Sequence, residues 1–158
     1  MEINYRPITA SDLHFLKELY RNTREEELNA AGWNELQKEK FIEFQFNAQH
    51  SHYINTFEHI DFLIIEFKKT DIGRLYLWKT DNQIRILDIS LLEKYRCRKI
   101  GTNIINALIN EANQTGKRLN LHVNKNNPAL KLYERLGFQK KEETEIDYFM
   151  ERLPNITA

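Results

Sequence analysis

A basic segment lies between an apolar stretch and a helical pattern near the middle of the chain, with the sequence Arg96-Cys97-Arg98-Lys99-Ile100-Gly101. The first N–H groups of a helix lack intrahelical acceptors and lie at the positive end of its dipole, so they can bind an anion directly. Three cationic side chains add charge at the same place. Taken alone, these residues fit a solvated basic turn about equally well. Their position between a strand and a helix favours a site for linked phosphates.

A second segment carries a candidate proton donor. Asn127 can cap a helix on which Tyr133 lies, and a tyrosine hydroxyl can protonate a leaving group. The spacing alone favours a core residue, because Tyr133 shares an apolar stripe with Leu132 and Leu136.

A carboxylate and a thiol complete the chemically active candidates. Asp88 interrupts an apolar strand, where a carboxylate is costly unless it is solvated or paired, so it is the candidate general base. A position on the wet face of the strand, or a pair with an arginine, explains Asp88 equally well, and a water chain would then serve as the base. No activating histidine pattern accompanies Cys97, which favours an incidental thiol over a nucleophile.

The two segments resemble the signatures of the GNAT acetyltransferase superfamily. Arg96 and Gly101 match its pyrophosphate signature, which is Gln or Arg, two residues, Gly, one residue, and Gly or Ala. Lys99 stands in place of the first glycine, at a cost of about 1 to 2 kcal/mol if the position needs a positive φ. Leu121–Phe138 is similar to the second motif almost throughout.

The resemblance implies a fold and a way of binding acetyl-CoA. The fold is α/β, with a mixed, mostly antiparallel seven-stranded sheet, helices on both faces and a splayed central pair formed by the strands Gln83–Leu91 and Arg118–Val123. Backbone groups of Ile89 and Leu91 would pair with the pantetheine arm lying in the gap, and one N–H would polarise the thioester carbonyl. Asn127, or Asn126 in its place, would bond the arm.

The implied activity is transfer of the acetyl group of acetyl-CoA, a co-substrate that needs no metal, directly onto a primary amine. Tyr133 would face the thioester sulfur as the acid. The implied cofactor-binding residues are Ile89, Leu91, Arg96, Cys97, Arg98, Lys99, Ile100, Gly101 and Asn127, with Tyr133 and Asp88 as the catalytic candidates.

Composition limits the partners. Lys plus Arg and Asp plus Glu both number 23, so no overall field favours nucleic acid or an anionic membrane. The charged opening residues and the short apolar runs predict neither a secretory signal nor a membrane span. A single cysteine fits a reducing cytoplasm. We expect one domain over residues 1–158, compatible with a homodimer, acting on an amine acceptor of unknown identity.

Periodicity predicts the order of the elements in the first half of the chain. A strand at Ile3–Pro7 precedes a capping box at Thr9-x-x-Asp12, which opens a helix with Leu13, Leu16 and Tyr20 inward. A second helix over Glu35–Ala48 has Leu36, Phe41, Phe44 and Ala48 near one face.

Three antiparallel strands follow, at Asp61–Phe67, Gly73–Trp78 and Gln83–Leu91. A helix ending at Gly116 connects the last of these to a parallel strand, Arg118–Val123. A helix ending at Gly137 and the strands Phe138–Glu142 and Ile146–Arg152 complete the chain.

The acceptor side and the type of activity leave alternatives. The run Glu25-Glu26-Glu27, with Trp33, Phe44, His50 and Tyr53 nearby, would suit a cationic amine, but a solvated helix face and core aromatics are the favoured interpretation. The alternative to an enzyme is a GNAT-fold module that binds acyl-CoA as a sensor or structural ligand. A nucleic-acid-binding domain is a further alternative, which the neutral net charge disfavours.

Overall fold

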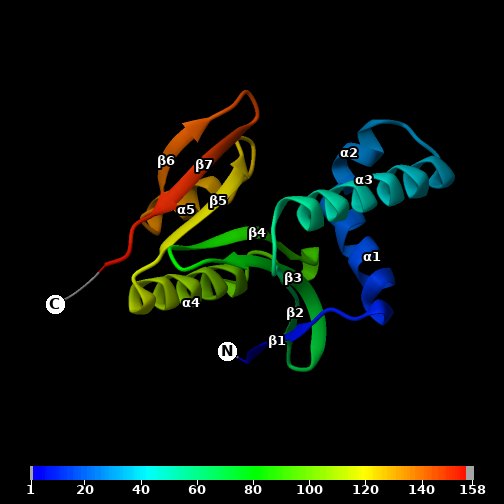
Figure 1. The fold of residues 1–158 in the computed structure, drawn as a ribbon. Helices are drawn as coiled ribbons and strands as arrows, with labels where there is room; N and C mark the ends of the chain where they lie inside the picture. Colours follow the sequence, from blue (N-terminus) through cyan, green and yellow to red (C-terminus); the bar gives the residue numbers. More distant parts are fainter. Residues whose placement is uncertain (1, 156–158) are drawn as a thin grey trace. The chain divides into compact units, whose positions relative to one another are not determined.

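The computed structural model describes residues 2–155 of the 158-residue chain (Figure 1). The described strands form one seven-stranded sheet in the order β1-β2-β3-β4-β5-β7-β6. Their bounds are Ile3–Pro7 (β1), Asp61–Phe67 (β2), Thr70–Lys79 (β3), Gln83–Leu91 (β4), Arg118–Asn124 (β5), Gln139–Glu143 (β6) and Asp147–Arg152 (β7). The sheet is mostly antiparallel with one parallel pair, β4 with β5, which confirms the predicted fold class and the predicted parallel neighbours.

The α-helices are α1 (Leu13–Thr23), α2 (Glu25–Ala30), α3 (Glu35–Thr56), α4 (Ile100–Thr115) and α5 (Leu130–Arg135), with 3-10 turns at Ala10–Asp12 and Glu93–Tyr95. The six-residue α2 was not predicted, because one and a half turns carry too little periodicity to separate from a loop. Within residues 2–155, no helix combines the length and the apolarity that crossing a bilayer requires.

The chain divides into two compact units, and β3 and β4 each contribute to both. The N-terminal unit contains Met1–Tyr76 and Ile89–Arg96, and the C-terminal unit contains Leu77–Asp88 and Cys97–Ala158. The two units are described separately below. A single domain over residues 1–158 stays a prediction.

An ion pair fixes the start of α1 in the N-terminal unit. The predicted capping box between Thr9 and Asp12 is confirmed. Both terminal nitrogens of Arg6 donate to the buried carboxylate of Asp12, at 2.9 and 2.8 Å, and Nη2 also donates to Asp71 at 2.9 Å. These hydrogen bonds and charges hold the pKa of Asp12 well below its usual range.

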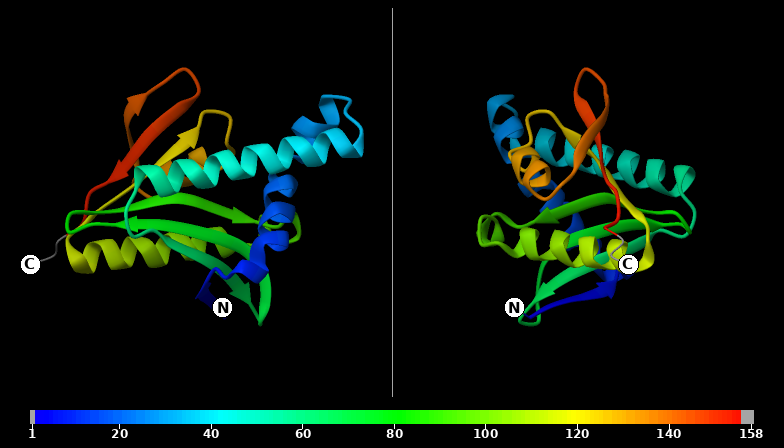
Figure 2. Two further views of the ribbon diagram at one scale, coloured as in Figure 1. Left: turned by 45° about the vertical axis from the view of Figure 1, so that its right-hand side comes forward. Right: turned by 90° about the vertical axis from the view of Figure 1, so that its left-hand side faces the viewer.

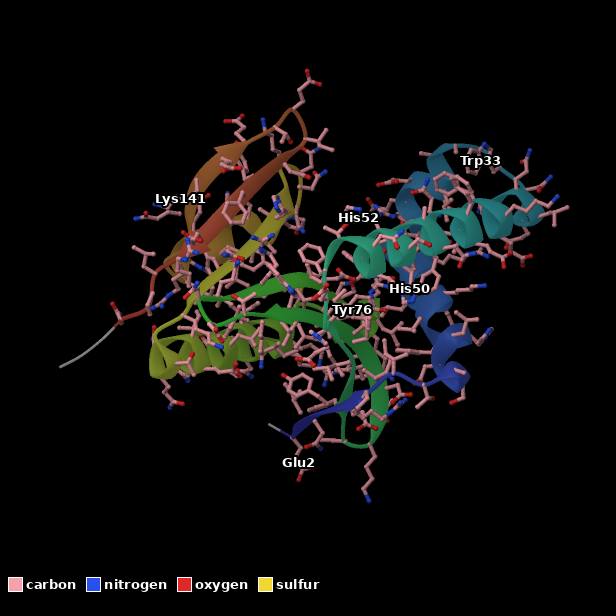
Figure 3. The ribbon with its side chains drawn as sticks, viewed as in Figure 1. Glu2, Trp33, His50, His52, Tyr76 and Lys141 are labelled. Atoms are coloured by element: carbon pink, nitrogen blue, oxygen red, sulfur yellow. The ribbon has the colours of Figure 1, made fainter. Side chains whose placement is uncertain are left out.

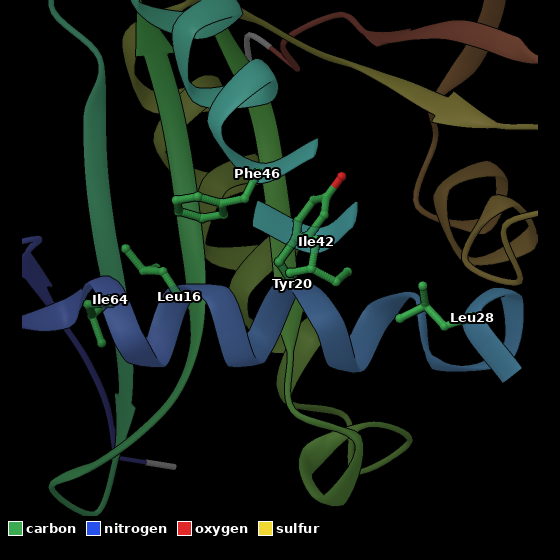
Figure 4. Close-up of a cluster of buried hydrophobic side chains, with 6 residues drawn as sticks. All are labelled: Leu16, Tyr20, Leu28, Ile42, Phe46 and Ile64. Carbon is green, nitrogen blue, oxygen red and sulfur yellow. The ribbon is translucent and has the colours of Figure 1, made fainter. Parts of the chain in front are cut away.

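The core of the N-terminal unit joins three helices to the sheet (Figure 4). Its members are buried apolar side chains from α1, α2, α3 and β2: Leu16, Tyr20, Leu28, Ile42, Phe46 and Ile64. The inward positions predicted for Leu16 and Tyr20 are therefore confirmed. The one predicted for Leu13 is wrong, since its side chain is 47% exposed: it is the first residue of α1, and the buried face begins one turn later.

Helix α3 buries a different face from the predicted one, and it is two turns longer. Leu36 and Phe44 are 60% and 69% exposed, while the buried side chains of the helix are Ile42, Phe46 and Tyr53. The prediction followed one of two apolar stripes on a helix that has apolar residues on several sides. Only contact with the sheet and α1 decides which stripe is buried.

The C-terminal unit is built around α4 and β5. The predicted inward residues of α4 are all buried, namely Ile104, Ile105, Leu108, Ile109 and Ala112. Gly116 takes the left-handed conformation (φ 66°) that ends the helix, as predicted. Strand β5 pairs antiparallel with β7 from Leu119 to Asn124, and β6 completes a hairpin with β7 (Figure 2).

Candidate functional site

The loop between β4 and α4 has two left-handed residues. Cys97 has φ 58° and Lys99, at the N-cap of α4, has φ 63°. The position occupied by Lys99 therefore is one that favours glycine, and this chain places a lysine there against a cost of about 1 to 2 kcal/mol. Their side chains, with that of Arg98 between them, are exposed.

Backbone donors at the start of α4 suit an anion. The first intrahelical bond runs from Asn103 N–H to the Lys99 carbonyl, at 3.0 Å. The N–H groups of Ile100, Gly101 and Thr102 precede it and so have no intrahelical acceptor. A left-handed residue followed by a right-handed helical one also turns successive N–H groups toward one point. The donors and the basic side chains fit a diphosphate, which is how acetyl-CoA would be held here.

Arg96 has a positioning role in the N-terminal unit. Its Nε donates to the Leu91 carbonyl at 2.9 Å, and its Nη2 donates to Asn22 Oδ1 at 3.0 Å. The same Asn22 oxygen accepts from the Glu93 N–H at 3.0 Å. Asn22 thus ties the end of α1 to the segment after β4. Nothing in the sequence around Asn22 indicates this link, because its partners lie more than 70 residues away.

The end of β4 also depends on a close approach of backbone. A Cβ atom built on Gly73 would lie 2.1 Å from the Ser90 carbonyl oxygen and 3.2 Å from the Leu91 Cα. Only glycine fits there, although it was predicted merely as the start of a strand. Ile89 and Leu91 are half-buried. Because the Leu91 carbonyl already accepts from Arg96, its N–H and the groups of Ile89 are the better candidates for pairing with a ligand.

The parallel ladder between β4 and β5 is short. It runs for four residue pairs, from Gln83↔Arg118 to Ile86↔Leu121, and no further pair follows within the described residues. Both strands nevertheless continue, β4 to Leu91 and β5 to Asn124. Beyond Leu121 the β4-facing edge of β5 therefore has no ladder partner. This arrangement leaves strand-edge groups able to pair with an extended ligand, as in recognition by strand addition.

Tyr133 is buried in the C-terminal unit, where its ring packs edge-on against Phe138 with a centroid distance of 5.6 Å. Burial, followed by the charge of Asp88, raises the pKa of Tyr133 to about 12. The hydroxyl makes no hydrogen bond to another described residue. The phenol therefore stays protonated throughout the physiological range and can donate to a partner that arrives with a ligand.

Asp88 and Tyr133 are brought together, since they interact electrostatically within the same unit. Asp88 is half-buried, and it alternates with the buried Ile84 and Ile86 on one face of β4. The solvated face of the strand is therefore not where it lies.

Asn127 has a local role at the start of α5. Its Oδ1 accepts from the Ala129 N–H at 2.9 Å, and its carbonyl accepts from the Leu130 N–H at 3.1 Å. The predicted cap is confirmed in this form. The side chain remains exposed, so its predicted contact with the pantetheine arm stays a prediction.

The aromatic residues proposed for an acceptor wall separate into two groups in the N-terminal unit. Trp33 lies at the start of α3 and packs on Phe41 (5.0 Å), whereas His50 lies near its other end and packs on Phe62 (5.3 Å) (Figure 3). Tyr53 is also at that end. They form no single wall.

The acidic run at the start of α2 faces its own surroundings. Glu25 lies 3.8 Å from Arg21, and Glu27 lies 3.9 Å from Arg24. A hollow of about 580 Å³ adjoins Glu25 and is lined by both acidic and basic side chains of α1 and α3. Its Lys17 pairs with its Glu43 at 3.1 Å. The favoured interpretation of the acidic run, a solvated helix face, fits these contacts.

Comparison with known proteins matches residues 16–138 to the model of the acetyltransferase (GNAT) family. The chain belongs to this family. Its matched region contains the β4–α4 loop, the short parallel ladder and the helix that carries Tyr133. The predicted resemblance is confirmed, whereas no curated protein sequence matches the chain.

Several solved GNAT structures share the fold. The PaiA N-acetyltransferase of Thermoplasma acidophilum in complex with coenzyme A has a TM-score of 0.69 at 22% identity, covering 97% of this chain and 99% of that one. A GNAT family acetyltransferase from Elizabethkingia anophelis with acetyl-CoA bound has a TM-score of 0.61 at 15% identity, with coverage of 96% and 97%. A chimera of the Vibrio cholerae spermidine N-acetyltransferase SpeG and hSSAT has a TM-score of 0.66 at 17% identity, with coverage of 97% and 96%.

Proposed function

We propose that this GNAT protein is an enzyme that transfers the acetyl group of acetyl-CoA directly onto a primary amine. The observation that carries the proposal is the early end of the β4–β5 ladder, because it frees strand-edge groups just where β4 leads toward an anion-binding helix start. Two structural neighbours that hold coenzyme A or acetyl-CoA support the choice of co-substrate.

The proposed binding roles follow from the donors on the page. N–H groups of Ile100 and Gly101, with the charges of Arg98 and Lys99, hold the diphosphate. Arg96 holds the Leu91 carbonyl, which fixes the end of β4. The Ile89 N–H is then the donor for the thioester carbonyl, where negative charge develops during attack.

Acetyl-CoA supplies the activated acyl group, and the protein manages two protons. The amine nitrogen forms a bond to the carbonyl carbon and loses a proton to Asp88 or to water. The bond from carbon to sulfur breaks, and Tyr133 donates its proton to the departing sulfur. Solvent then returns a proton to Tyr133, so the amide and the free thiol are the only products.

The proposed setting is the cytoplasm, where a single exposed cysteine stays reduced. The acceptor is an amine in solution rather than a nucleic acid or a membrane, since the equal numbers of cationic and anionic residues give no general attraction to either.

Calorimetry with acetyl-CoA and thiol release with a panel of amines test the proposal together. We expect saturable binding and amine-dependent release of free thiol, with Tyr133→Phe lowering turnover by about 100-fold. Binding without turnover on any amine would support the non-catalytic acyl-CoA-binding module instead. Absence of binding at saturating acetyl-CoA would overturn both.

A further inference from the structure

A cationic and aromatic cluster lies on one face of the sheet in the C-terminal unit. It is formed by side chains from β3, β4, β5 and β7: Trp78, Arg85, Asn120, His122 and Phe149. Arg85 alternates with the buried Ile84 and Ile86, and Asn120 alternates with the buried Leu119 and Leu121. The cluster therefore lies on the sheet face opposite to the one that these apolar residues share.

The hydrogen bonds of Arg85 leave part of its guanidinium unused. Its Nε donates to Asn120 Oδ1, and its Nη2 lies 3.4 Å from Gln83 Oε1. Its guanidinium carbon is 4.9 Å from the centre of the Phe149 ring and 5.9 Å from that of the Trp78 ring. Its Nη1 donates to no other described residue. The rings and amides thus fix the guanidinium while one edge remains open to a ligand.

No carboxylate within residues 2–155 forms an ion pair with Arg85. The nearest acid in the cluster's surroundings, Glu151, is engaged elsewhere: it accepts from Asn120 Nδ2 at 3.1 Å and lies 3.6 Å from Arg118. Burial lowers the pKa of Arg85, although the charge of Glu151 opposes this. A half-buried cation that lacks an anionic partner gains free energy when one binds.

The second titratable side chain of the cluster does not compete for an anion. Burial lowers the pKa of His122, and the positive charge of Arg85 lowers it further, while Asp147 and Glu142 act in the other direction. His122 is therefore mostly neutral at neutral pH. Its ring packs on Phe149, with a centroid distance of 5.0 Å. The cluster presents one positive charge between aromatic surfaces.

The position of Arg85 relates the cluster to the proposed reaction. Along a strand, residues two and four apart lie on the same face, roughly 7 and 13 Å away. Arg85 therefore shares its face of β4 with Leu87 and with Ile89, the proposed donor to the thioester carbonyl. An anionic group about as far from the amine as in an amino acid or a short peptide comes within reach of the long arginine side chain.

We infer that Arg85, held between Trp78 and Phe149, binds a carboxylate of the acceptor, so that the substrate is an amine that also carries a carboxylate. The inference rests on the proposed function and deepens it. A planar carboxylate matches the open edge of a guanidinium. A phosphate monoester, with up to two negative charges, would meet only one cation here and would lie near Glu151.

Matched acceptors test the inference. The probes are phenylalanine and glycylphenylalanine, each compared with its C-terminal carboxamide, which keeps the shape and removes the charge. Phosphoethanolamine tests the other anion. We expect kcat/KM to favour the carboxylates in the wild-type protein, and Arg85→Gln to reduce this preference by about 10- to 100-fold, because a charged hydrogen bond is lost. Arg85→Lys, which keeps the charge, should retain part of it.

Arg118→Met is the matched control. Arg118 is a neighbouring cation that pairs with Glu151 and is about half exposed, so its loss should leave the preference unchanged. An equal effect of Arg85→Gln on acids and amides would overturn the inference, as would a preference for phosphoethanolamine. Circular dichroism checks that Arg85→Gln is folded, and if it is not, Arg85→Lys decides.

A binding measurement separates the inference from the proposed function. If no amine is acetylated, the proposed function fails, but N-acetylphenylalanine and its carboxamide can still be titrated into the wild-type protein and Arg85→Gln. Tighter binding of the acid to the wild-type protein alone supports the carboxylate site. Equal affinities of the two compounds would rule it out whatever the catalytic result.

Discussion

Helices α3 and α4 each carry many apolar residues, yet they relate differently to their own sequences. In α4 the apolar residues form one stripe, and that stripe is the buried face. In α3 they occur on several sides, so that Phe46 is buried while Phe44 is 69% exposed. A single apolar stripe determines how a helix packs on a sheet. A helix with competing stripes is oriented by its neighbours, and it leaves large apolar side chains on the surface.

The largest expected effect contrasts two phenylalanines of α3. Phe46→Ala should lower the free energy of unfolding by about 4 kcal/mol, because it opens a cavity among Tyr20, Leu16 and Ile64. Phe44→Ala should change it by less than about 0.5 kcal/mol. Urea denaturation followed by circular dichroism measures both. Similar losses for the two variants would mean that α3 packs by its other stripe.

A second prediction concerns Tyr133 in the C-terminal unit. Its pKa is raised to about 12 from 10.0, so the unfolded chain ionises first and stability is lost as the pH rises from about 10 to 12. Two pKa units correspond to about 3 kcal/mol. The unfolding free energy of Tyr133→Phe should therefore fall less than that of the wild type over this range, by about that amount. Parallel pH curves for the two proteins would show that Tyr133 is not effectively buried.

A third prediction concerns the start of α1 in the N-terminal unit, where Arg6 holds Asp12. Asp12→Asn should cost about 2 kcal/mol, because it leaves a partly buried guanidinium without its carboxylate. The depressed pKa of Asp12 means that its contribution is present above about pH 4 and is lost as the pH falls further. Acid titration of stability should be shallower in the variant. Asp81→Asn, in an exposed turn, serves as the control.

The smallest effect is expected at the entrance to α4. Lys99→Gly should raise the unfolding free energy by about 1 kcal/mol, because glycine adopts the left-handed conformation without strain. Acetyl-CoA affinity should fall at the same time if the lysine charge contributes to the phosphate site. Lys117→Gly, outside the left-handed region, should not stabilise. A destabilised Lys99→Gly would show that strain at this position is negligible.

The sequence by itself determined the elements whose causes are local. The capping box at Thr9, the left-handed end of α4 at Gly116 and the parallel pairing of β4 with β5 depend on residues within a few turns or on a standard connection. The family motifs around Lys99 and Tyr133 are contiguous for the same reason. The roles of these residues in binding and catalysis stay predictions.

Tertiary structure alone decided the contacts between residues far apart in the chain. Asn22 holds Arg96, Gly73 makes room for the Ser90 carbonyl, and Arg85 meets Asn120 and Phe149 from two other strands. Each contact depends on strand register or helix packing, which long-range burial sets and no local pattern encodes. The same physical reason explains why the buried face of α3 had to be observed, whereas that of α4 could be predicted.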